Sequence, residues 1–333
     1  MAHNDQLSLL PGFSNHDTDR LLECSFAGML MRSPIMTASG TFGYGGEYPS
    51  LENFPVDVIG AIILKSVTRH PRKGNPEPRF VETPAGLINS IGLQNVGIEK
   101  LVLEELPKVR KYNTNIIVSI AGSSIEEYGE IAKILNKSDD FEAVEVNISC
   151  PNVEEKGMLF SFDPNLSSSV TKVVKSEISE RPVIMKLSPN APDIVATAMA
   201  CAFAGADAIS LVNTFTALSI DIERRMPKLM RNFGGLSGPA IKPIALAMVA
   251  KVAEAFKQHQ IQTPIIGIGG ILTGEDALEY IIAGSSAVGV GTSIFYNPTV
   301  LKKIYLGLKK YCEKHNQSIS QLMGTLTMNP QIE

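Results

Sequence analysis

The sequence of 333 residues is poor in the features that build metal centres and membrane spans. It has no tryptophan and only four cysteines, which form no CxxC pair and have no histidine near them at metal-ligand spacing. No uninterrupted apolar run reaches about 18 residues, the length that a transmembrane helix needs. We therefore expect no zinc, no iron–sulfur cluster ligated by this chain, and no membrane partner.

A strong charge of either sign is also absent. The net charge is −4, charged residues make up 19% of the sequence, and basic residues cluster only from Arg69 to Lys73. This balance gives no electrostatic reason to expect a nucleic-acid partner. The polar segment from Met1 to Arg20 lacks the basic and apolar stretches of a secretory signal. The sequence thus predicts a cytoplasmic protein whose thiols stay free.

Eight short apolar runs recur along the chain, and nearly every one ends on a small or polar residue. The runs span 33–40, 61–66, 115–122, 143–152, 182–188, 208–214, 264–270 and 287–292. Amphipathic segments near 97–111, 124–136, 165–178, 191–204, 241–257, 274–283 and 297–313 separate most of them. Strand and helix in alternation predict a parallel sheet, and eight such runs predict a (β/α)8 TIM barrel of the α/β class.

The chain is long enough for one barrel domain with insertions. We expect a single domain over 1–333 with a barrel core of about 30–315. Three stretches do not fit a minimal barrel: 1–32, 69–95 and 215–240. The first is expected to form an entry hairpin, and the others lids or binding loops at the catalytic face. Helix starts are expected at Gly97, Ser123-Ser124, Asp163-Pro164, Ala191-Pro192-Asp193 and Asn297-Pro298.

Glycines follow the seventh and eighth runs, as Gly269-Gly270 and Gly291-Thr292. At these positions a barrel commonly binds phosphate through exposed backbone N–H groups, although glycine also suits a plain tight turn. The chain has neither the P-loop lysine motif nor a GxGxxG motif after a first strand. A mononucleotide cofactor such as FMN fits this combination.

Two lysines end apolar runs, Lys65 and Lys186. A buried cation needs a partner, and a flavin ring that becomes anionic on reduction would supply one. Two other interpretations of Lys186 stay open. It could form a Schiff base, as in barrel aldolases, or it could extend its ammonium group to solvent.

Cys150 differs from Cys24, Cys201 and Cys312, which we interpret as small buried apolar residues. It follows the fourth run in a polar loop, where a thiol can be exposed and can titrate. With no histidine or metal ligand nearby in the sequence, proton abstraction from carbon is a more natural task than acyl transfer.

Four asparagines lie in segments that are expected to converge on the same face, and each amide offers both donors and an acceptor. Such a set matches the alternating N–H and C=O groups of a pyrimidinedione, although each one singly could serve a turn. They are Asn89, Asn147, Asn152 and Asn213.

With these motifs the chain resembles the class 1 dihydroorotate dehydrogenases over about residues 20–315. The stretches that carry the resemblance are Ala38-Ser39-Gly40, Lys65-Ser66, Gly74-Asn75-Pro76-x-Pro78-Arg79, Asn89-Ser90-Ile91-Gly92-Leu93-x-Asn95, Asn147-x-Ser149-Cys150-Pro151-Asn152, Asn213-Thr214, Gly234 to Pro243 and Gly267-x-Gly269-Gly270. Class 2 enzymes use a serine base and carry an amino-terminal membrane segment, so Cys150 and the polar terminus argue against that class.

Within class 1, the segments Lys186 to Asn190 and Gly234 to Pro243 resemble the 1B branch. The resemblance implies a homodimer that forms a heterotetramer with a subunit carrying FAD and a [2Fe–2S] cluster, through which electrons pass to NAD. The 1A branch instead reduces fumarate as a homodimer. The loop from Glu154 to Phe162 lacks the paired glycines expected of 1B members, and 215–232 is individual to this chain.

The resemblance also implies roles for single residues in oxidising dihydroorotate to orotate, a step of pyrimidine biosynthesis. Cys150 would take the C5 proton while a hydride passes from C6 to N5 of FMN. The substrate would be held by Lys65, Asn89, Asn147, Asn152, Asn213 and Thr214. The FMN would be held by Ser39, Gly40, Lys65, Ser66, Asn147, Lys186, Gly238, Gly269, Gly270, Gly291 and Thr292.

Three other functions stay open from the sequence. A flavoprotein acting on dihydrouracil, like dihydropyrimidine dehydrogenase, would share the barrel and the cysteine. An aldolase would use Lys186 as a Schiff base, and a non-catalytic barrel would only bind a phosphorylated ligand.

Overall fold

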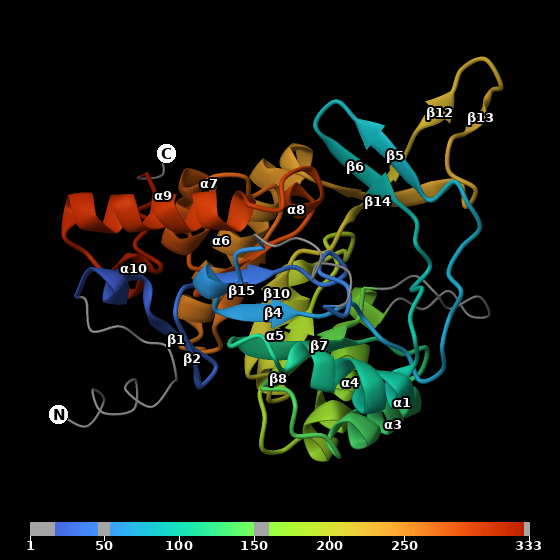
Figure 1. Cartoon of the computed structure of the whole chain (residues 1–333), viewed down its shortest axis with the longest axis horizontal. Helices are drawn as coiled ribbons and strands as arrows, with labels where there is room; N and C mark the ends of the chain where they lie inside the picture. Colours follow the sequence, from blue (N-terminus) through green and yellow to red (C-terminus); the bar gives the residue numbers. More distant parts are fainter. Residues whose placement is uncertain (1–16, 46–53, 150–159, 330–333) are drawn as a thin grey trace.

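A closed barrel of eight parallel strands forms the centre of the molecule (Figure 1). We describe a computed structural model of the chain, over residues 17–45, 54–149 and 160–329. The barrel strands are β3 (Ile35–Thr37), β4 (Ala61–Ile63), β7 (Asn115–Ile120), β8 (Ala143–Asn147), β9 (Val183–Lys186), β10 (Ala208–Leu211), β15 (Ile265–Ile268) and β16 (Ala287–Val290). Each lies within one of the eight apolar runs, so the predicted (β/α)8 barrel is confirmed.

The strands follow one another around the barrel in sequence order, and β16 closes the ring by pairing with β3. All barrel pairs are parallel, so every strand ends on the same rim. The register sets which side chains share a level: Ser119 on β7 lies opposite Glu145 on β8, and Asn147 lies opposite Lys186 on β9.

Helices follow most strands, as the amphipathic segments predict. They are α1 (Ile98–Lys100), α2 (Leu106–Val109), α3 (Ile125–Leu135), α4 (Pro164–Glu177), α5 (Ile194–Phe203), α6 (Lys242–Gln258), α7 (Gly274–Ile282), α8 (Ser293–Tyr296), α9 (Val300–His315) and α10 (Ile319–Leu322). Short 3-10 helices are η2 (Asp17–Leu22), η3 (Val56–Val58), η5 (Phe160–Phe162) and η6 (Pro239–Ile241). Ser124, Asp163 and Asp193 cap helices through their side-chain oxygens, which confirms three of the predicted helix starts.

Two helices differ from the predicted pattern. The segment 97–111 is interrupted by the π-helical turn η4 (Leu101–Glu105), because Pro107 lies in the first turn of α2 and cannot donate a backbone hydrogen bond. The segment 297–313 begins at Val300 rather than at Pro298. There the Asn297 side chain accepts a hydrogen bond from the Thr299 amide and so shapes a turn before the helix.

The three insertions form additional strands. β1 (Cys24–Phe26) and β2 (Met29–Met31) make the expected entry hairpin. The second and third insertions pair with each other in a four-stranded antiparallel sheet of β5 (Phe80–Thr83), β6 (Gly86–Asn89), β14 (Phe233–Ser237) and β11 (Phe215–Leu218). The small hairpin of β12 (Ile220–Asp221) and β13 (Met226–Pro227) extends beyond this sheet (Figure 1).

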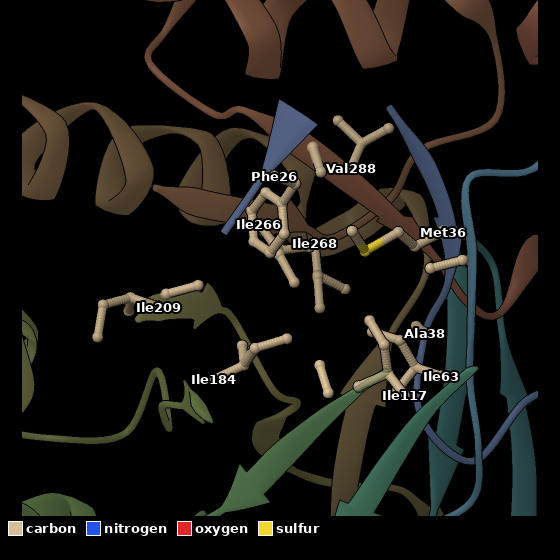
Figure 2. Close-up of a cluster of buried hydrophobic side chains, with 14 of the residues drawn as sticks. Phe26, Met36, Ala38, Ile63, Ile117, Ile184, Ile209, Ile266, Ile268 and Val288 are labelled. Atoms are coloured by element: carbon tan, nitrogen blue, oxygen red, sulfur yellow. The ribbon is translucent and has the colours of Figure 1, made fainter. Parts of the chain in front are cut away.

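The apolar core fills the barrel and the space between the barrel and its helices. Figure 2 shows part of it, with Met36, Ile63, Ile117 and Ile184 contributed by four different barrel strands. Phe26 of the entry hairpin belongs to the same cluster and is fully buried. None of the helices in the described part of the chain combines the length and apolar composition that a membrane span requires.

Candidate functional site

A cavity of about 740 Å³ lies at the carboxyl ends of the barrel strands, between the barrel rim and the inserted sheet. It brings together every predicted site residue that the structure describes. These are Ser39, Gly40, Lys65, Ser66, Asn89, Asn147, Lys186, Asn213, Thr214, Gly238, Gly269, Gly270, Gly291 and Thr292. Two further predicted residues, Cys150 and Asn152, lie outside the described residues.

The barrel places the predicted residues because its strands end together. Asn147 and Lys186 are the last residues of β8 and β9 and lie opposite each other in the parallel register. Ser39, Lys65 and Asn213 follow β3, β4 and β10 by two residues each. Strand-end residues of a closed parallel barrel face one shared space, which accounts for their convergence.

The inserted sheet supplies a second wall of the cavity. Asn89, the last residue of β6, donates a hydrogen bond of 3.1 Å from Nδ2 to the carbonyl oxygen of Gly235 on β14. A Cβ atom at Gly235 would collide with Oγ1 of Thr214. Glycine at this position therefore lets the inserted sheet approach the loop that follows β10.

Hydrogen bonds fix the orientation of the asparagine amides. Oδ1 of Asn147 accepts from the backbone amide of Ser149 at 3.1 Å, from its hydroxyl at 3.0 Å and from Nδ2 of Asn213 at 3.4 Å. Nδ2 of Asn147 donates to Oγ of Ser66 at 3.3 Å. Because the oxygen and nitrogen atoms have different partners, the amide of Asn147 has one favoured orientation.

Asn190 is a site residue to which the sequence assigned no role. Its Nδ2 donates to the carbonyl oxygen of Thr214 at 3.1 Å, and its Oδ1 accepts from the amide of Thr216 at 3.0 Å. It thereby fixes the loop that carries Asn213 and Thr214 into the cavity. Only the three-dimensional structure brings these segments together, since more than 20 positions of sequence, from 190 to 214, separate them.

Glycines form a cradle at one end of the cavity, where Gly238, Gly269, Gly270 and Gly291 present backbone rather than side chains. Gly270 has a φ of +65°, and a Cβ atom there would lie 2.7 Å from Cβ of Lys242 and 2.9 Å from the Gly238 carbonyl oxygen. The backbone is thus held in a form that only glycine adopts without strain. The cradle fits a phosphate group, which close-packed backbone amides can bind.

The charge of the cavity wall is positive. Among the described residues that line it, Lys65, Arg79 and Lys186 are cationic and none is an aspartate or glutamate. Asn, Ser and Thr side chains make up much of the remaining polar surface. This arrangement suits a ligand, or two adjacent ligands, that carry negative charge and several hydrogen-bonding groups.

Beneath the cavity lies a carboxylate to which the sequence assigned no role. Glu145 in β8 is fully buried, and its Oε1 is 3.7 Å from Nζ of Lys186. At this distance the two side chains form a buried ion pair, and the carboxylate offsets the charge of the lysine. The signal was present in the sequence as an acidic residue between two valines in the strand Ala143–Asn147.

Four phenylalanines border the cavity and remain partly open to solvent. Their exposed fractions are 52% for Phe80, 40% for Phe162, 57% for Phe233 and 52% for Phe295. They come from β5, η5, β14 and α8, which are distant in sequence. The sequence alone does not predict this aromatic rim, because a single phenylalanine is usually interpreted as a residue of the apolar core.

The chain is similar to known proteins over most of its length. The family model described as "Dihydroorotate dehydrogenase" matches residues 21–312. The relative named "Dihydroorotate dehydrogenase B (NAD(+)), catalytic subunit" in Geobacter sp. (strain M21) is 48% identical over 308 residues, which cover 92% of this chain and 98% of that protein.

Proteins with the same name in two other organisms are similar. The one from Geobacter sulfurreducens is 48% identical, and the one from Alkaliphilus metalliredigens is 46% identical, each over 306 residues. In both cases the match covers 92% of this chain and 98% of the relative.

The three cysteines that the structure describes, Cys24, Cys201 and Cys312, are all buried. Burial raises the pKa of the Cys24 and Cys201 thiols to about 12. At pH 8 roughly one such thiol in ten thousand is ionised, and the thiolate is the reactive form. We expect iodoacetamide at pH 8 to leave Cys24 and Cys201 of the folded protein unlabelled, as measured by mass spectrometry of tryptic peptides.

Unfolding in urea provides the control for this prediction, because it exposes both thiols and restores an ordinary pKa. Labelling of Cys24 or Cys201 in the folded protein at the rate seen in urea would contradict it.

Proposed function

Because the chain belongs to the dihydroorotate dehydrogenase family, we propose that it oxidises dihydroorotate to orotate in pyrimidine biosynthesis and passes the electrons on to NAD. The observation that carries the proposal is the cavity at the barrel rim. It has cationic side chains, a set of amides and a glycine cradle, and no acidic residue among its described lining. This composition fits an anionic pyrimidine and a phosphorylated cofactor together.

FMN is the cofactor proposed, one per chain, and when bound it supplies the two-electron acceptor of the reaction. Gly238, Gly269, Gly270, Gly291 and Thr292 would hold its phosphate. Oγ1 of Thr292 donates to Oγ of Ser237 at 2.7 Å, which ties the loop after β16 to the inserted sheet next to Gly238. Ser39, Gly40, Ser66, Asn147 and Lys186 would bind the rest of the cofactor.

The substrate carries a carboxylate and a ring with alternating N–H and C=O groups. Asn89, Asn147, Asn213 and Thr214 offer donors and acceptors that match such a ring, and Lys65 would hold the carboxylate. Asn190 would act indirectly, since it orients the loop of Asn213 and Thr214. The hydrogen bonds among these groups supply a binding surface that needs little rearrangement.

Cys150 is proposed as the base that takes the C5 proton of dihydroorotate, with Asn152 as a further substrate contact. Ser149, the residue before Cys150, lines the cavity, and its hydroxyl hydrogen-bonds to Asn147. Cys150 therefore follows directly in sequence a residue of the cavity wall. A thiol near its ordinary pKa of about 8.5 can act as a base in the neutral to alkaline range.

An electron-transfer partner is part of the proposal, because the relatives are named as catalytic subunits of an NAD(+) enzyme. We propose a partner that carries FAD and a [2Fe–2S] cluster, in a heterotetramer built on a homodimer of this chain. Next to the cavity lies a solvent-exposed apolar surface, the aromatic rim of Phe80, Phe162, Phe233 and Phe295. Exposed apolar surfaces of this kind are typical of sites that bind another protein. Electron transfer to NAD through a partner replaces the fumarate alternative.

Anaerobic visible spectroscopy of the purified chain tests the function. We expect a yellow protein whose flavin absorbance bleaches when dihydroorotate is added, and much less bleaching with dihydrouracil, which lacks the carboxylate that Lys65 would bind. A chain that stays colourless after incubation with FMN would contradict the cofactor assignment. Faster bleaching by dihydrouracil than by dihydroorotate would contradict the substrate assignment.

Replacement of the proposed base gives the second test. We expect Cys150→Ser to keep FMN and to bind orotate, but to slow flavin reduction by roughly 10²- to 10⁴-fold near neutral pH, the usual contribution of a general base. In the parent enzyme the rate should rise with pH toward the thiol pKa, and this rise should be absent in the variant. Anaerobic stopped-flow absorbance measures both, and a parental rate in Cys150→Ser would rule out Cys150 as the base.

The glycine cradle generates a further prediction. Gly270→Ala puts a Cβ atom where φ is +65° and where Lys242 and the Gly238 carbonyl leave no room. We expect it to weaken FMN binding at least about tenfold, since left-handed backbone alone costs about 1–2 kcal/mol. Gly291→Ala is the matched variant: its nearest neighbour would be Cβ of Ala38 at 3.3 Å, so a smaller loss is expected. Fluorescence titration of the apoprotein with FMN measures both, and equal affinities in the two variants would contradict the prediction.

A further inference from the structure

Glu145 is a buried carboxylate that lies below the cavity and does not line it. Among the described residues, Glu145 and Lys186 are the charged side chains that fall in the buried class, with exposed fractions of 0% and 4%. An ionised carboxylate in such a place requires compensation, because it has lost its water. The groups around Glu145 must therefore supply this compensation.

The partners of Glu145 come from three other barrel strands. Lys186 Nζ on β9 is 3.7 Å from Oε1, Ser119 Oγ on β7 donates to Oε1 at 3.1 Å, and Ser210 Oγ on β10 donates to Oε2 at 3.3 Å. The register places Ser119 opposite Glu145 and Ser210 opposite Lys186. The four side chains thus form one polar layer inside the barrel.

The distance from Glu145 to Lys186 is longer than that of a charge-assisted hydrogen bond, about 2.7–2.9 Å. The carboxylate therefore compensates the ammonium charge without taking a close hydrogen bond from it. Lys186 also lines the cavity, so its N–H groups stay available to a ligand there.

An ionised Glu145 also sets the direction of a chain of hydroxyl groups, because a carboxylate can only accept. Ser119 donates to Glu145, so in the 2.8 Å contact between the two hydroxyls Ser66 must donate to Ser119. The Ser66 oxygen is then an acceptor for Nδ2 of Asn147. Ser66 and Asn147 both line the cavity. The charge of Glu145 is therefore connected to the cavity wall in two ways, through Lys186 and through the hydroxyl groups of Ser119 and Ser66.

We propose that Glu145 is a positioning residue that balances Lys186 and thereby limits how strongly the cavity stabilises a reduced, anionic flavin over the neutral oxidised form. The inference rests on the proposed flavin function. Without the carboxylate, the charge of Lys186 would act undiminished on the bound ring. With it, the site binds both redox forms with less difference in affinity, so the cofactor can be reduced by substrate and still give its electrons up.

The test uses the full-length flavin-loaded protein and two neutral variants, Glu145→Gln and Glu145→Met. Both remove the charge, but only Gln keeps the shape and part of the hydrogen bonding. In each we expect the affinity for reduced relative to oxidised flavin to rise at least about tenfold, which is an upward shift of the midpoint potential of about 30 mV for a two-electron couple. Anaerobic equilibration with a reference dye measures the potential without any turnover.

Ser210→Ala is the matched control, because it removes a hydrogen bond to the same carboxylate and keeps the charge. We expect its potential to stay within about 10 mV of the parent, a roughly twofold change in the affinity ratio. If only one neutral variant folds and binds flavin, that variant carries the test.

The outcomes distinguish a failure of the role of Glu145 from a failure of the proposed flavin function. A parental potential in a folded neutral variant, or an equal shift in Ser210→Ala, would overturn the role of Glu145 and leave the flavin function intact. A parent chain that binds no flavin would overturn the proposed function and this inference with it. An upward shift in the neutral variants alone supports the inference.

Discussion

Closure of the parallel barrel is the constraint on which the rest of the structure depends. Once β16 pairs with β3, all eight strands end on one rim, and residues from Ser39 to Thr292 share one cavity. The same closure fixes the levels inside the barrel. Because Asn147 lies opposite Lys186 in the parallel register, the last residues of two strands point their polar groups at the same space. A shift of one residue in this register would turn one of them away from the cavity.

The inserted sheet complements what the barrel provides. The barrel rim contributes Lys65, Lys186 and three glycines of the cradle, Gly269, Gly270 and Gly291, whereas the inserted sheet contributes Asn89, the backbone of β14 and Gly238 directly after it. The contact between the two depends on Gly235, where any side chain would collide with Thr214. The cavity is therefore enclosed by two different structures. The close-packed barrel fixes the positions of the side chains on its rim, and the antiparallel sheet can approach the barrel closely because Gly235 has no side chain.

The sequence predicted the features that depend on local pattern. Each barrel strand is a short apolar run, and Ser124, Asp163 and Asp193 mark helix starts through chemistry within three residues. It did not predict features that depend on contacts between distant segments. The pairing of β6 with β14 joins Asn89 to Gly235 across 146 positions of sequence. The two insertions were correctly assigned to the catalytic face, yet nothing in either one indicates that they pair with each other.

Glu145 shows the same limit at a single residue. An acidic side chain in a buried strand is visible in the sequence, but its partners Lys186, Ser119 and Ser210 are specified only by the register of the closed barrel. The position of Glu145 below the cavity wall suits the negative charge of the proposed ligands. A carboxylate on the cavity wall would repel a phosphate and a substrate carboxylate directly. Glu145 instead lies two residues before Asn147, about 6.6 Å back along the same strand, and it does not line the cavity, whereas its partner Lys186 does. There it reduces the excess positive charge of the site without standing on the wall that would contact the proposed anionic ligands.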